Sequence, residues 1–345
     1  MRERIMDANL NRLCEGLRVI EDIARFGLDD AALAGPVKAM RLEAGRLRQT
    51  LAGGLLTARD SLGDVGRLRI KEPERRADLA AVLGASFGRV AESLRVLEEL
   101  AKLTEGGAAA RAKALRYQSY ELEKQLLPLV DRRQRAARLR GLYLVMSAPR
   151  VGHERLTEMA IAAGVAAIQL REKNWEGGRI LELARRLRAM TRGTATMLFI
   201  NDRPDIARLC EADGVHLGQG DLAVADARRI AGERMLVGKS THNPAQLRAA
   251  RAEQPDYVGI GPVFGTASKA IPDPVLGLKR AGAMRRQAGV PAVAIGGLGG
   301  GNLAQIFEQG FTCYALITHV GQAEDPLKVM RRLKRLERAA GIKCV

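Results

Sequence analysis

Short apolar runs alternate with longer amphipathic segments along the second part of the chain, from Leu142 onward. The apolar runs are typical of buried parallel strands, and the amphipathic segments have the periodicity of helices. Eight such units in about 200 residues predict an α/β fold that closes into a (β/α)8 TIM barrel, with an open doubly wound sheet as the alternative. The predicted strands are Leu142–Met146, Val165–Leu170, Met197–Ile200, Gly214–Leu217, Met235–Val237, Tyr257–Ile260, Ala292–Ile295 and Tyr314–Ile317.

Residues 1–127 show helical periodicity instead, and they contain an internal repeat. The segment Asp7–Arg25 matches Leu83–Lys102, and Lys38–Arg41 matches Lys113–Arg116. Two copies of a helix-plus-helix unit predict an all-α duplicated bundle of four or more helices. In the first pair of segments, Arg12, Glu15, Leu17, Arg18, Val19, Glu21 and Ala24 match Arg89, Glu92, Leu94, Arg95, Val96, Glu98 and Ala101.

The first helix of this bundle has two faces. Its apolar stripe is expected to be buried. The charged face opposite is either a solvated surface of ion pairs or one wall of a cleft in which arginines bind phosphate. The apolar stripe comprises Leu10, Leu13, Leu17, Ile20, Ile23 and Ala24. Possible metal or hydroxyl ligands are Asp7, Asn9 and Asn11 on the helix and Asp60, Asp64 and Gly66 in a following loop.

The polar segment 131–140 has no apolar periodicity and lies where the pattern changes from helical to alternating. It is predicted to be a linker between an all-α domain, 1–130, and a barrel domain, 141–345.

Composition excludes several classes of protein. Hydrophobic residues make up 47% and charged residues 28% of the chain, which is typical of a globular protein. The four dispersed cysteines indicate reduced thiols, and no apolar run is long enough for a membrane helix, so a cytoplasmic protein without membrane contact is expected. The net charge of +17 suits anionic small substrates or nucleic acid, but aromatic residues, at 3%, are too few for base-stacking platforms.

Polar residues follow nearly every predicted strand. In a barrel these positions meet at one mouth, where active sites are built. Arg171, Lys173 and Lys269 are cations for phosphates, and Asn201 and Ser240 can donate hydrogen bonds. Asp202 and Asp221 are oxygen ligands suited to Mg²⁺, which usually takes one or two carboxylates.

A second anion site is expected after the last two strands. The Gly296-Gly297 turn and Thr318 occupy the place where barrels commonly bind a phosphate through backbone N–H groups. Two anion sites and one metal together imply a diphosphate substrate and a phosphorylated one. His216 and His242 are candidate general bases, although His216 is better explained as a packed barrel residue, and Ser240 has no evident catalytic partner in the sequence.

These motifs resemble thiamine phosphate synthase over residues 142–320. The resemblance is carried by Gln169–Lys173, Asn201–Arg203, Asp213–Asp221, Gly261–Phe264 and Ile295–Gly297. It implies a transferase that joins hydroxymethylpyrimidine diphosphate to a thiazole phosphate, with Mg²⁺ as cofactor. Departures from the family pattern are Gly265, where Pro is frequent, and Thr318-His319, where Ser-Ala is usual.

The resemblance also implies roles for individual residues. Asp202 and Asp221 hold magnesium, and Arg171, Lys173 and Lys269 act in catalysis on the leaving diphosphate. The pyrimidine diphosphate is bound by Gln169, Leu170, Arg171, Glu172, Lys173, Asn201, Ser240 and Lys269. The thiazole phosphate is bound by Thr266, Ala267, Ser268, Gly297, Ile317 and Thr318.

The N-terminal region resembles a helical domain that precedes some thiamine phosphate synthases and is associated with phosphorylating hydroxymethylpyrimidine phosphate. Asp7–Arg12, Glu15–Arg18 and Glu21–Phe26 carry this resemblance, which implies ATP as phosphate donor. No P-loop motif is present, so an ordinary P-loop kinase is excluded. The alternative for this region is a structural or oligomerising bundle, and a homo-oligomer is possible.

Two other functions compete with the synthase. A thiazole tautomerase-like barrel resembles the synthase but lacks its complete metal and diphosphate set, whereas Asp202, Asp221 and Lys269 are all present here. A nucleic-acid-binding or regulatory module would use the positive charge and would elute from heparin with a steep salt dependence.

Overall fold

The computed structural model describes residues 1–51, 55, 57–59, 75–103, 106–266 and 273–342. The chain divides into two compact units, Met1–Asp131 and Arg132–Val345. Each unit has its own hydrophobic core.

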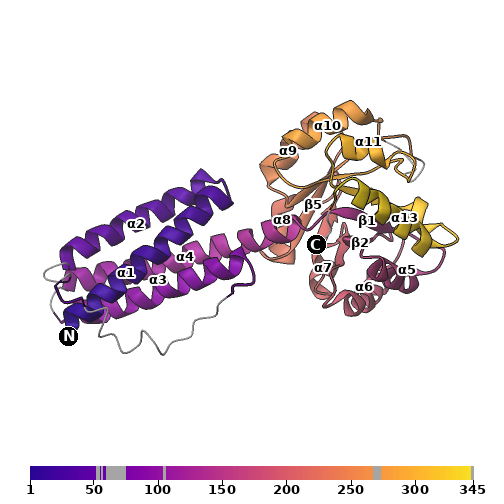
Figure 1. Cartoon of the computed structure of the whole chain (residues 1–345). Coiled ribbons are helices and arrows are strands. Elements are labelled where there is room, and N and C mark those ends of the chain that lie inside the picture. Colours follow the sequence, from indigo (N-terminus) through magenta and orange to yellow (C-terminus); the bar gives the residue numbers. More distant parts are fainter. Residues whose placement is uncertain (52–54, 56, 60–74, 104–105, 267–272, 343–345) are drawn as a thin grey trace. The chain divides into compact units, whose positions relative to one another are not determined.

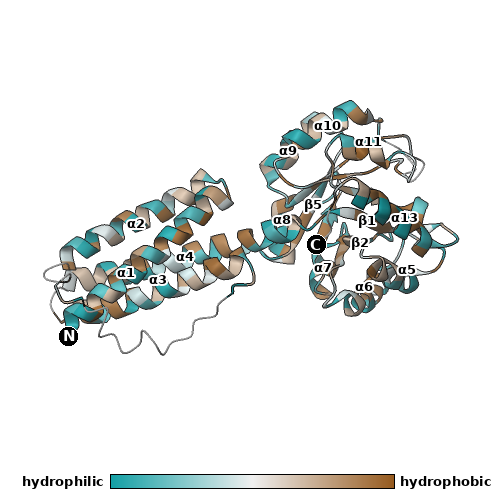
Figure 2. Cartoon of the chain, in the orientation of Figure 1, coloured by the Kyte–Doolittle hydropathy of each residue, from teal (hydrophilic) through white to brown (hydrophobic). Residues whose placement is uncertain are grey.

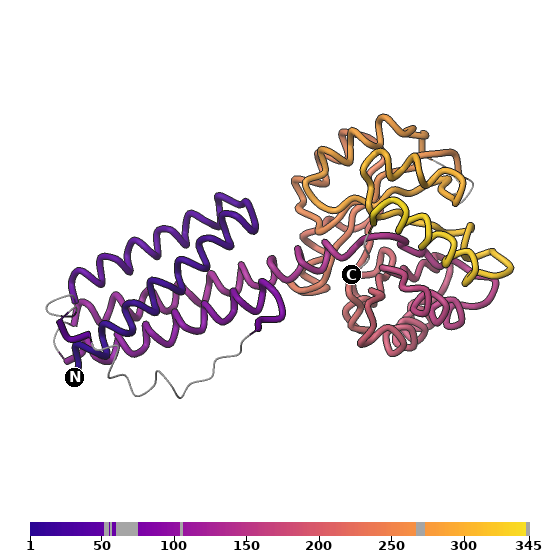
Figure 3. The backbone as a smooth tube through the Cα atoms, in the orientation of Figure 1, coloured from indigo at the N-terminus to yellow at the C-terminus, as the bar shows by residue number. Residues whose placement is uncertain are grey.

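In the described residues of the first unit, every secondary-structure element is a helix (Figures 1 and 3). α1 packs along α3 and also against α2, so the predicted all-α bundle is confirmed. Its helices are α1 (Arg2–Asp22), the π-helix η1 (Ile23–Gly27), α2 (Ala31–Leu51), α3 (Leu79–Ala101) and α4 (Gly106–Ala136).

The predicted apolar stripe runs along α1 into η1 and is buried, since every one of its six side chains is at most 7% exposed. Hydrophobic and hydrophilic residues alternate along the four helices, as Figure 2 shows. Gly16 allows α1 to approach α3 closely, since a Cβ atom there would lie 2.8 Å from Cγ2 of Val90. The pattern of apolar positions therefore determined the buried face correctly.

The internal repeat reappears as a repeated ion pair. In the first copy, Glu21 of α1 accepts hydrogen bonds from Arg41 of α2. In the second copy, Glu98 of α3 accepts them from Arg116 of α4, with Nη2 at 2.9 Å. Both glutamates are buried, so each copy has an internally neutralised acid in its core.

The second unit is a closed barrel of eight parallel strands in sequential order, as predicted. β5 is longer than the predicted strand Met235–Val237, because its pairing with β6 continues to Thr241 opposite Ile260. The strands are β1 (Gly141–Met146), β2 (Ala167–Leu170), β3 (Met197–Asn201), β4 (Gly214–Leu217), β5 (Leu236–Thr241), β6 (Tyr257–Ile260), β7 (Ala292–Ala294) and β8 (Cys313–Leu316).

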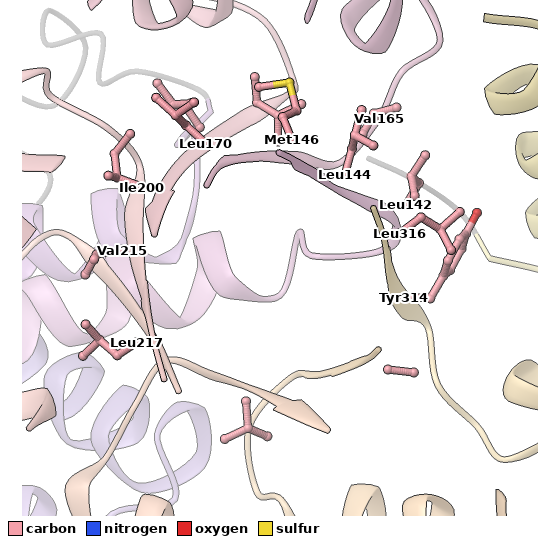
Figure 4. Close-up of a cluster of buried hydrophobic side chains, with 14 of the residues drawn as sticks. Leu142, Leu144, Met146, Val165, Leu170, Ile200, Val215, Leu217, Tyr314 and Leu316 are labelled. Carbon is pink, nitrogen blue, oxygen red and sulfur yellow. The ribbon is translucent and has the colours of Figure 1, made fainter. Parts of the chain in front are cut away.

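Helices surround the strands and cover their outer faces (Figure 1). Figure 4 shows apolar side chains of this layer, among them Leu144, Met146 and Leu170, which belong to the larger of the two cores in the barrel unit. The helices are α5 (His153–Ala162), α6 (Gly177–Thr191), α7 (Pro204–Leu209), α8 (Val224–Ala231), α9 (Pro244–Glu253), α10 (Gly277–Gln287), α11 (Leu303–Glu308), α12 (Thr318–Gly321) and α13 (Pro326–Ala339).

The segment predicted as a linker is ordered in its first part, because α4 continues to Ala136. Arg132 is buried and donates from Nε to Asp256 at 3.0 Å, while Ala136 and Leu139 pack with residues inside the barrel. The limits 1–130, 131–140 and 141–345 stay a prediction.

No helix in the described part of the chain is long and apolar enough to cross a membrane. Cys14, Cys210 and Cys313 carry free thiols, whereas Cys344 lies outside the described residues.

Candidate active site

The interior of the barrel is filled by large side chains. The rings of Tyr143, Phe199 and Tyr257 contact one another, with ring centroids 5.4 to 6.1 Å apart. All three are at most 3% exposed. Because the barrel is plugged there, a ligand has room only beyond the rings, toward the carboxyl ends of the strands.

A pocket with two adjoining parts opens at those ends. One part, of about 450 Å³, contains Lys173, Asp202 and Asp221. The other, of about 160 Å³, contains Gly297 and Thr318. The residues that line both parts are Arg171, Asn201, His216, Ser240, His242 and Asp273.

The segment after β2 alternates in direction, as strand geometry requires. Arg171 lines both parts of the pocket, and among the described residues its guanidinium has neither an ion-pair nor a hydrogen-bond partner. Gln169, two residues earlier, donates from Nε2 to Oδ1 of Asn201 at 3.2 Å. The hydrogen-bonded amides of Gln169 and Asn201 and the guanidinium of Arg171 therefore line the same part of the pocket.

Two residues predicted to bind substrate point elsewhere. The Leu170 side chain belongs to the core between strands and helices, where it is 1% exposed. Glu172 accepts hydrogen bonds from the backbone N–H of Ala148 and lies 2.8 Å from Nε2 of His153. Neither lines the pocket, because they occupy the alternate positions of the extended segment, so any substrate contact of Leu170 would involve main-chain atoms.

Two carboxylates face each other beside a lysine. Asp202 follows β3 with a positive φ of 60°, and its Oδ2 lies 3.4 Å from Nζ of Lys173. Burial, together with a hydrogen bond and like charge from Asp221, raises the pKa of Asp202 to about 6, and Lys173 offsets only part of this. Asp221 also accepts a hydrogen bond from the N–H of Gly218 at 2.7 Å. The donor set matches a divalent cation, which would relieve the repulsion between the acids.

A hydrogen-bonded chain links the pocket to the barrel interior. Oγ of Ser240 lies 2.9 Å from Nε2 of His216, whose Nδ1 lies 3.0 Å from the hydroxyl of Tyr257. That hydroxyl is 3.0 Å from the hydroxyl of Tyr143, and burial raises the pKa of both phenols, which stay neutral. The Ser240–His216 pair was not predicted, although both residues lie near the ends of neighbouring strands, which was the available signal.

A second histidine pairs with an acid. Nε2 of His242 lies 3.5 Å from Oδ2 of Asp273, and its Nδ1 lies 2.6 Å from the carbonyl oxygen of Gly261. Asp273 was not predicted, because nothing in the sequence indicates that this residue lies at the mouth of the barrel.

The turn after β7 supplies backbone to the smaller part of the pocket. Gly297 has a φ of +64°, and a Cβ atom there would lie 2.4 Å from the carbonyl oxygen of Gly265, so only glycine fits. Ile317, Thr318 and His319 line the same part. The ring of His319 packs against the glycine turn, with Nε2 accepting a long hydrogen bond from the N–H of Gly300 at 3.4 Å.

Most predicted site residues thus come together. Thr266 lines the smaller part of the pocket. Ala267, Ser268 and Lys269 lie outside the described residues. The roles of all these residues remain predictions.

In the helical unit, Asp7 is buried and accepts from Arg59 at 2.7 and 2.9 Å, which lowers the pKa of Asp7. Asn11 also donates to Asp7, while Asn9 bonds to the carbonyl oxygen of Ile5. The loop residues predicted beside them, Asp60, Asp64 and Gly66, lie outside the described residues.

The fold and the mouth define a (β/α)8-barrel enzyme whose site combines cations, paired carboxylates and a glycine turn. Residues 142–320 match the family model described as thiamine monophosphate synthase, and residues 4–125 match the ThiD2 family. The chain belongs to the thiamine monophosphate synthase family.

Relatives match along nearly the whole chain. The thiamine-phosphate synthase of Nostoc punctiforme is 41% identical over 335 residues, which cover 96% of this chain and 92% of that protein. The thiamine-phosphate synthase of Thermosynechococcus vestitus is 42% identical, with 96% and 94% covered. The solved thiamine phosphate pyrophosphorylase of Pyrococcus furiosus is 29% identical, with a TM-score of 0.55, over 59% of this chain and 98% of that one.

Proposed function

We propose that the barrel joins hydroxymethylpyrimidine diphosphate to a thiazole phosphate and releases thiamine phosphate and diphosphate. One observation carries this proposal: Lys173, Asp202 and Asp221 line the same part of the pocket as Arg171, which has no ion-pair partner in the described part of the chain. This set suits a metal-bound diphosphate, and the family membership supports the same reaction.

The leaving group departs from the larger part of the pocket. The C–O bond between the pyrimidine methylene and the diphosphate breaks, and its electron pair leaves with the diphosphate. Arg171, Lys173 and, by the family resemblance, Lys269 stabilise the charge that develops on the phosphate oxygens. Asp202 and Asp221 would hold Mg²⁺, which supplies further positive charge to the diphosphate when bound.

The electrophile and the nucleophile meet where the two parts of the pocket adjoin. Gln169 and Asn201, bonded to each other, are placed to bind the polar edge of the pyrimidine ring. The thiazole nitrogen donates its lone pair to the methylene carbon, so no protein nucleophile is needed. The Ser240–His216 pair therefore serves to orient the Ser240 hydroxyl and does not form a covalent intermediate.

The thiazole phosphate occupies the smaller part of the pocket, against Gly297, Ile317 and Thr318, with Thr266, Ala267 and Ser268 as further predicted contacts. His319 narrows this part where a smaller residue is usual in the family. The pocket thus offers one part for each of the two substrates.

The helical unit is proposed to supply the diphosphate. The terminal phosphoryl group of ATP would pass to a phosphate oxygen of hydroxymethylpyrimidine phosphate, giving ADP and the diphosphate that the barrel consumes. The match of residues 4–125 to the ThiD2 family supports this activity. A purely structural bundle and a tautomerase-like barrel are the alternatives, and no comparison favours either.

A single experiment tests both activities. The full-length protein is given pyrimidine monophosphate, ATP, Mg²⁺ and thiazole phosphate, and thiamine phosphate is measured. The expected result is product from this mixture and also from the pyrimidine diphosphate without ATP. Product only from the diphosphate would remove the kinase and keep the synthase. No product from either would overturn the synthase, and ADP formation from pyrimidine monophosphate and ATP then decides the kinase.

A further inference from the structure

The helical unit has a pocket of its own, of about 430 Å³. It is formed by the end of α1, the π-helix η1, the turn that follows and the first turns of α2. Its lining includes the charged residues Glu21, Arg25, Asp29, Asp30 and Lys38 and the aromatic Phe26. Nothing in the barrel reaction uses these residues.

Phe26 gives this pocket an aromatic surface. Its side chain is 72% exposed, and the guanidinium carbon of Arg25 lies 4.7 Å from the ring centroid. The residue sits in η1, and π-helical turns occur frequently at functional sites. An aromatic ring kept in water on a defined turn offers a face on which a planar ligand can stack.

The internal repeat provides a comparison for the cations. In the second copy, Glu99 neutralises two of them, with Arg95 at 3.0 Å and Lys102 at 2.9 Å. Asp22 stands at the position of Glu99 in the first copy.

The matching cations of the first copy, Arg18 and Arg25, have no carboxylate partner among the described residues, and Lys38 and its counterpart Lys113 have none either. The pocket of the first copy therefore has the cations Arg25 and Lys38, unpaired in the described part of the chain, beside Asp29 and Asp30, and Asp30 is engaged by the N–H groups of Ala32 and Leu33. The second copy neutralises the counterpart of Arg25, Lys102.

The buried glutamates of the two copies also differ in how many arginines pair with them. Glu98 is held by two arginines, Arg95 at 3.1 Å and Arg116 at 2.9 Å. Glu21 is held by Arg41 alone and lines the pocket. A carboxylate has two oxygens with several lone pairs, so Glu21 retains capacity to accept a hydrogen bond from a ligand amino group.

We infer that this pocket binds a planar heteroaromatic ring bearing a phosphate. The ring stacks on Phe26, the phosphate pairs with Arg25 and Lys38, and Glu21 accepts from a ring amino group. The inference rests on the proposed kinase function of the helical unit. Both pyrimidine monophosphate and ATP have this chemistry, and the experiment distinguishes them.

The test measures equilibrium dissociation constants of full-length protein for pyrimidine monophosphate and for ATP. It uses an Arg171→Gln background, which weakens binding in the barrel. Lys38→Gln is expected to raise the dissociation constant of one of the two ligands at least about tenfold, which is the effect of losing a charge-assisted hydrogen bond. Phe26→Leu introduces the residue type that the second copy has at the equivalent position, Leu103. It is expected to raise the dissociation constant of the same ligand at least about fivefold.

The second copy provides the matched controls Lys113→Gln and Lys102→Gln. Each should change the dissociation constants for pyrimidine monophosphate and ATP less than about twofold, because exposed charges that do not line the pocket contribute little to binding. All four side chains replaced are exposed, so folding is checked by thermal melting and is expected to be unchanged.

The outcomes separate the inference from the kinase proposal. If the protein phosphorylates pyrimidine monophosphate but Lys38→Gln and Phe26→Leu bind and turn over normally, the pocket inference is wrong and the kinase stands. If there is no phosphorylation but binding depends on these residues, the kinase is wrong and the pocket stands. Absence of binding of both ligands to the parent protein overturns the inference.

Discussion

The acids in the core of the helical unit and the half-buried Asp202 at the mouth of the barrel have different neighbours. In the helical unit, Glu21, Glu98 and Asp7 are each paired with an arginine of the same unit. In the barrel, Asp202 faces another acid, with only Lys173 as a partial counter-charge. A charge that the fold itself neutralises contributes to structure, whereas an acid left beside another acid is held ready for a cation from outside.

The largest expected effect concerns Asp202. Asp202→Asn keeps the size of the side chain and suits the left-handed backbone, but it removes one of the two carboxylates proposed for magnesium. Thiamine phosphate formation is expected to fall roughly 10²- to 10³-fold, the range found when one electrostatic contact to a developing charge is lost.

The same variant should be more stable than the parent without metal. The pKa of Asp202 is raised, so ionisation at neutral pH costs free energy in the folded state. Removing that charge is expected to raise the free energy of unfolding by about 1 kcal/mol, a value reduced for solvent screening. Loss of stability in metal-free Asp202→Asn would contradict the view that the two acids repel.

Removing a paired acid from the helical unit should destabilise the protein, in contrast to Asp202→Asn. Burial alone would raise the pKa of Glu98, but the hydrogen bond and charge of Arg116 lower it. Glu98→Ala is expected to destabilise the protein by about 2 kcal/mol in chemical denaturation, because it leaves Arg116 without its partner. Glu99→Ala, which removes an exposed pair, serves as control and should cost less than about 0.5 kcal/mol.

The pH dependence of stability follows from the sign of the shift at Glu98. The folded-state pKa lies below the ordinary value of 4.5, so the contribution is present above that pH and is lost on acidification. The difference in free energy of unfolding between the parent protein and Glu98→Ala should therefore shrink as the pH falls. A difference that stays constant down to acid pH would contradict this assignment.

A smaller effect is expected in the pH dependence of the barrel. With a pKa of about 6, Asp202 is increasingly protonated below pH 6, and protons then compete with magnesium. The magnesium concentration for half-maximal synthase activity should rise about tenfold between pH 7 and pH 5, as competition with one such group requires. In Asp221→Asn the like charge is absent, so this dependence should move to lower pH; an unmoved profile would exclude Asp202 as its origin.

The smallest effect is expected at His216, which positions Ser240. His216→Phe leaves the Ser240 hydroxyl without the imidazole, and the KM for pyrimidine diphosphate should rise about threefold to tenfold with a smaller change in kcat. His216→Gln, which can still bond to Ser240, should recover part of the loss. A collapse of kcat with unchanged KM would instead assign His216 to the chemical step.

Local periodicity determined much of this protein from the sequence alone. The stripe from Leu10 to Ala24 is buried because residues three and four apart share one face of a helix. The eight strands were predictable because a parallel strand is buried on both faces of its sheet and therefore has a short continuous apolar run. The grouping of polar residues at the strand ends followed from the barrel, since parallel strands end at one mouth.

Contacts between distant residues were decided only by the tertiary structure. Pairing of neighbouring strands in register brought Asp202 against Asp221 and Ser240 against His216. The alternation of side chains along the segment after β2 placed Leu170 and Glu172 on the side away from the pocket. Helix packing selected Arg41 as the partner of Glu21 and left Arg25 without a carboxylate partner among the described residues. Sequence spacing specifies which face a residue occupies, but the partner across that face depends on how whole elements pack and in which register.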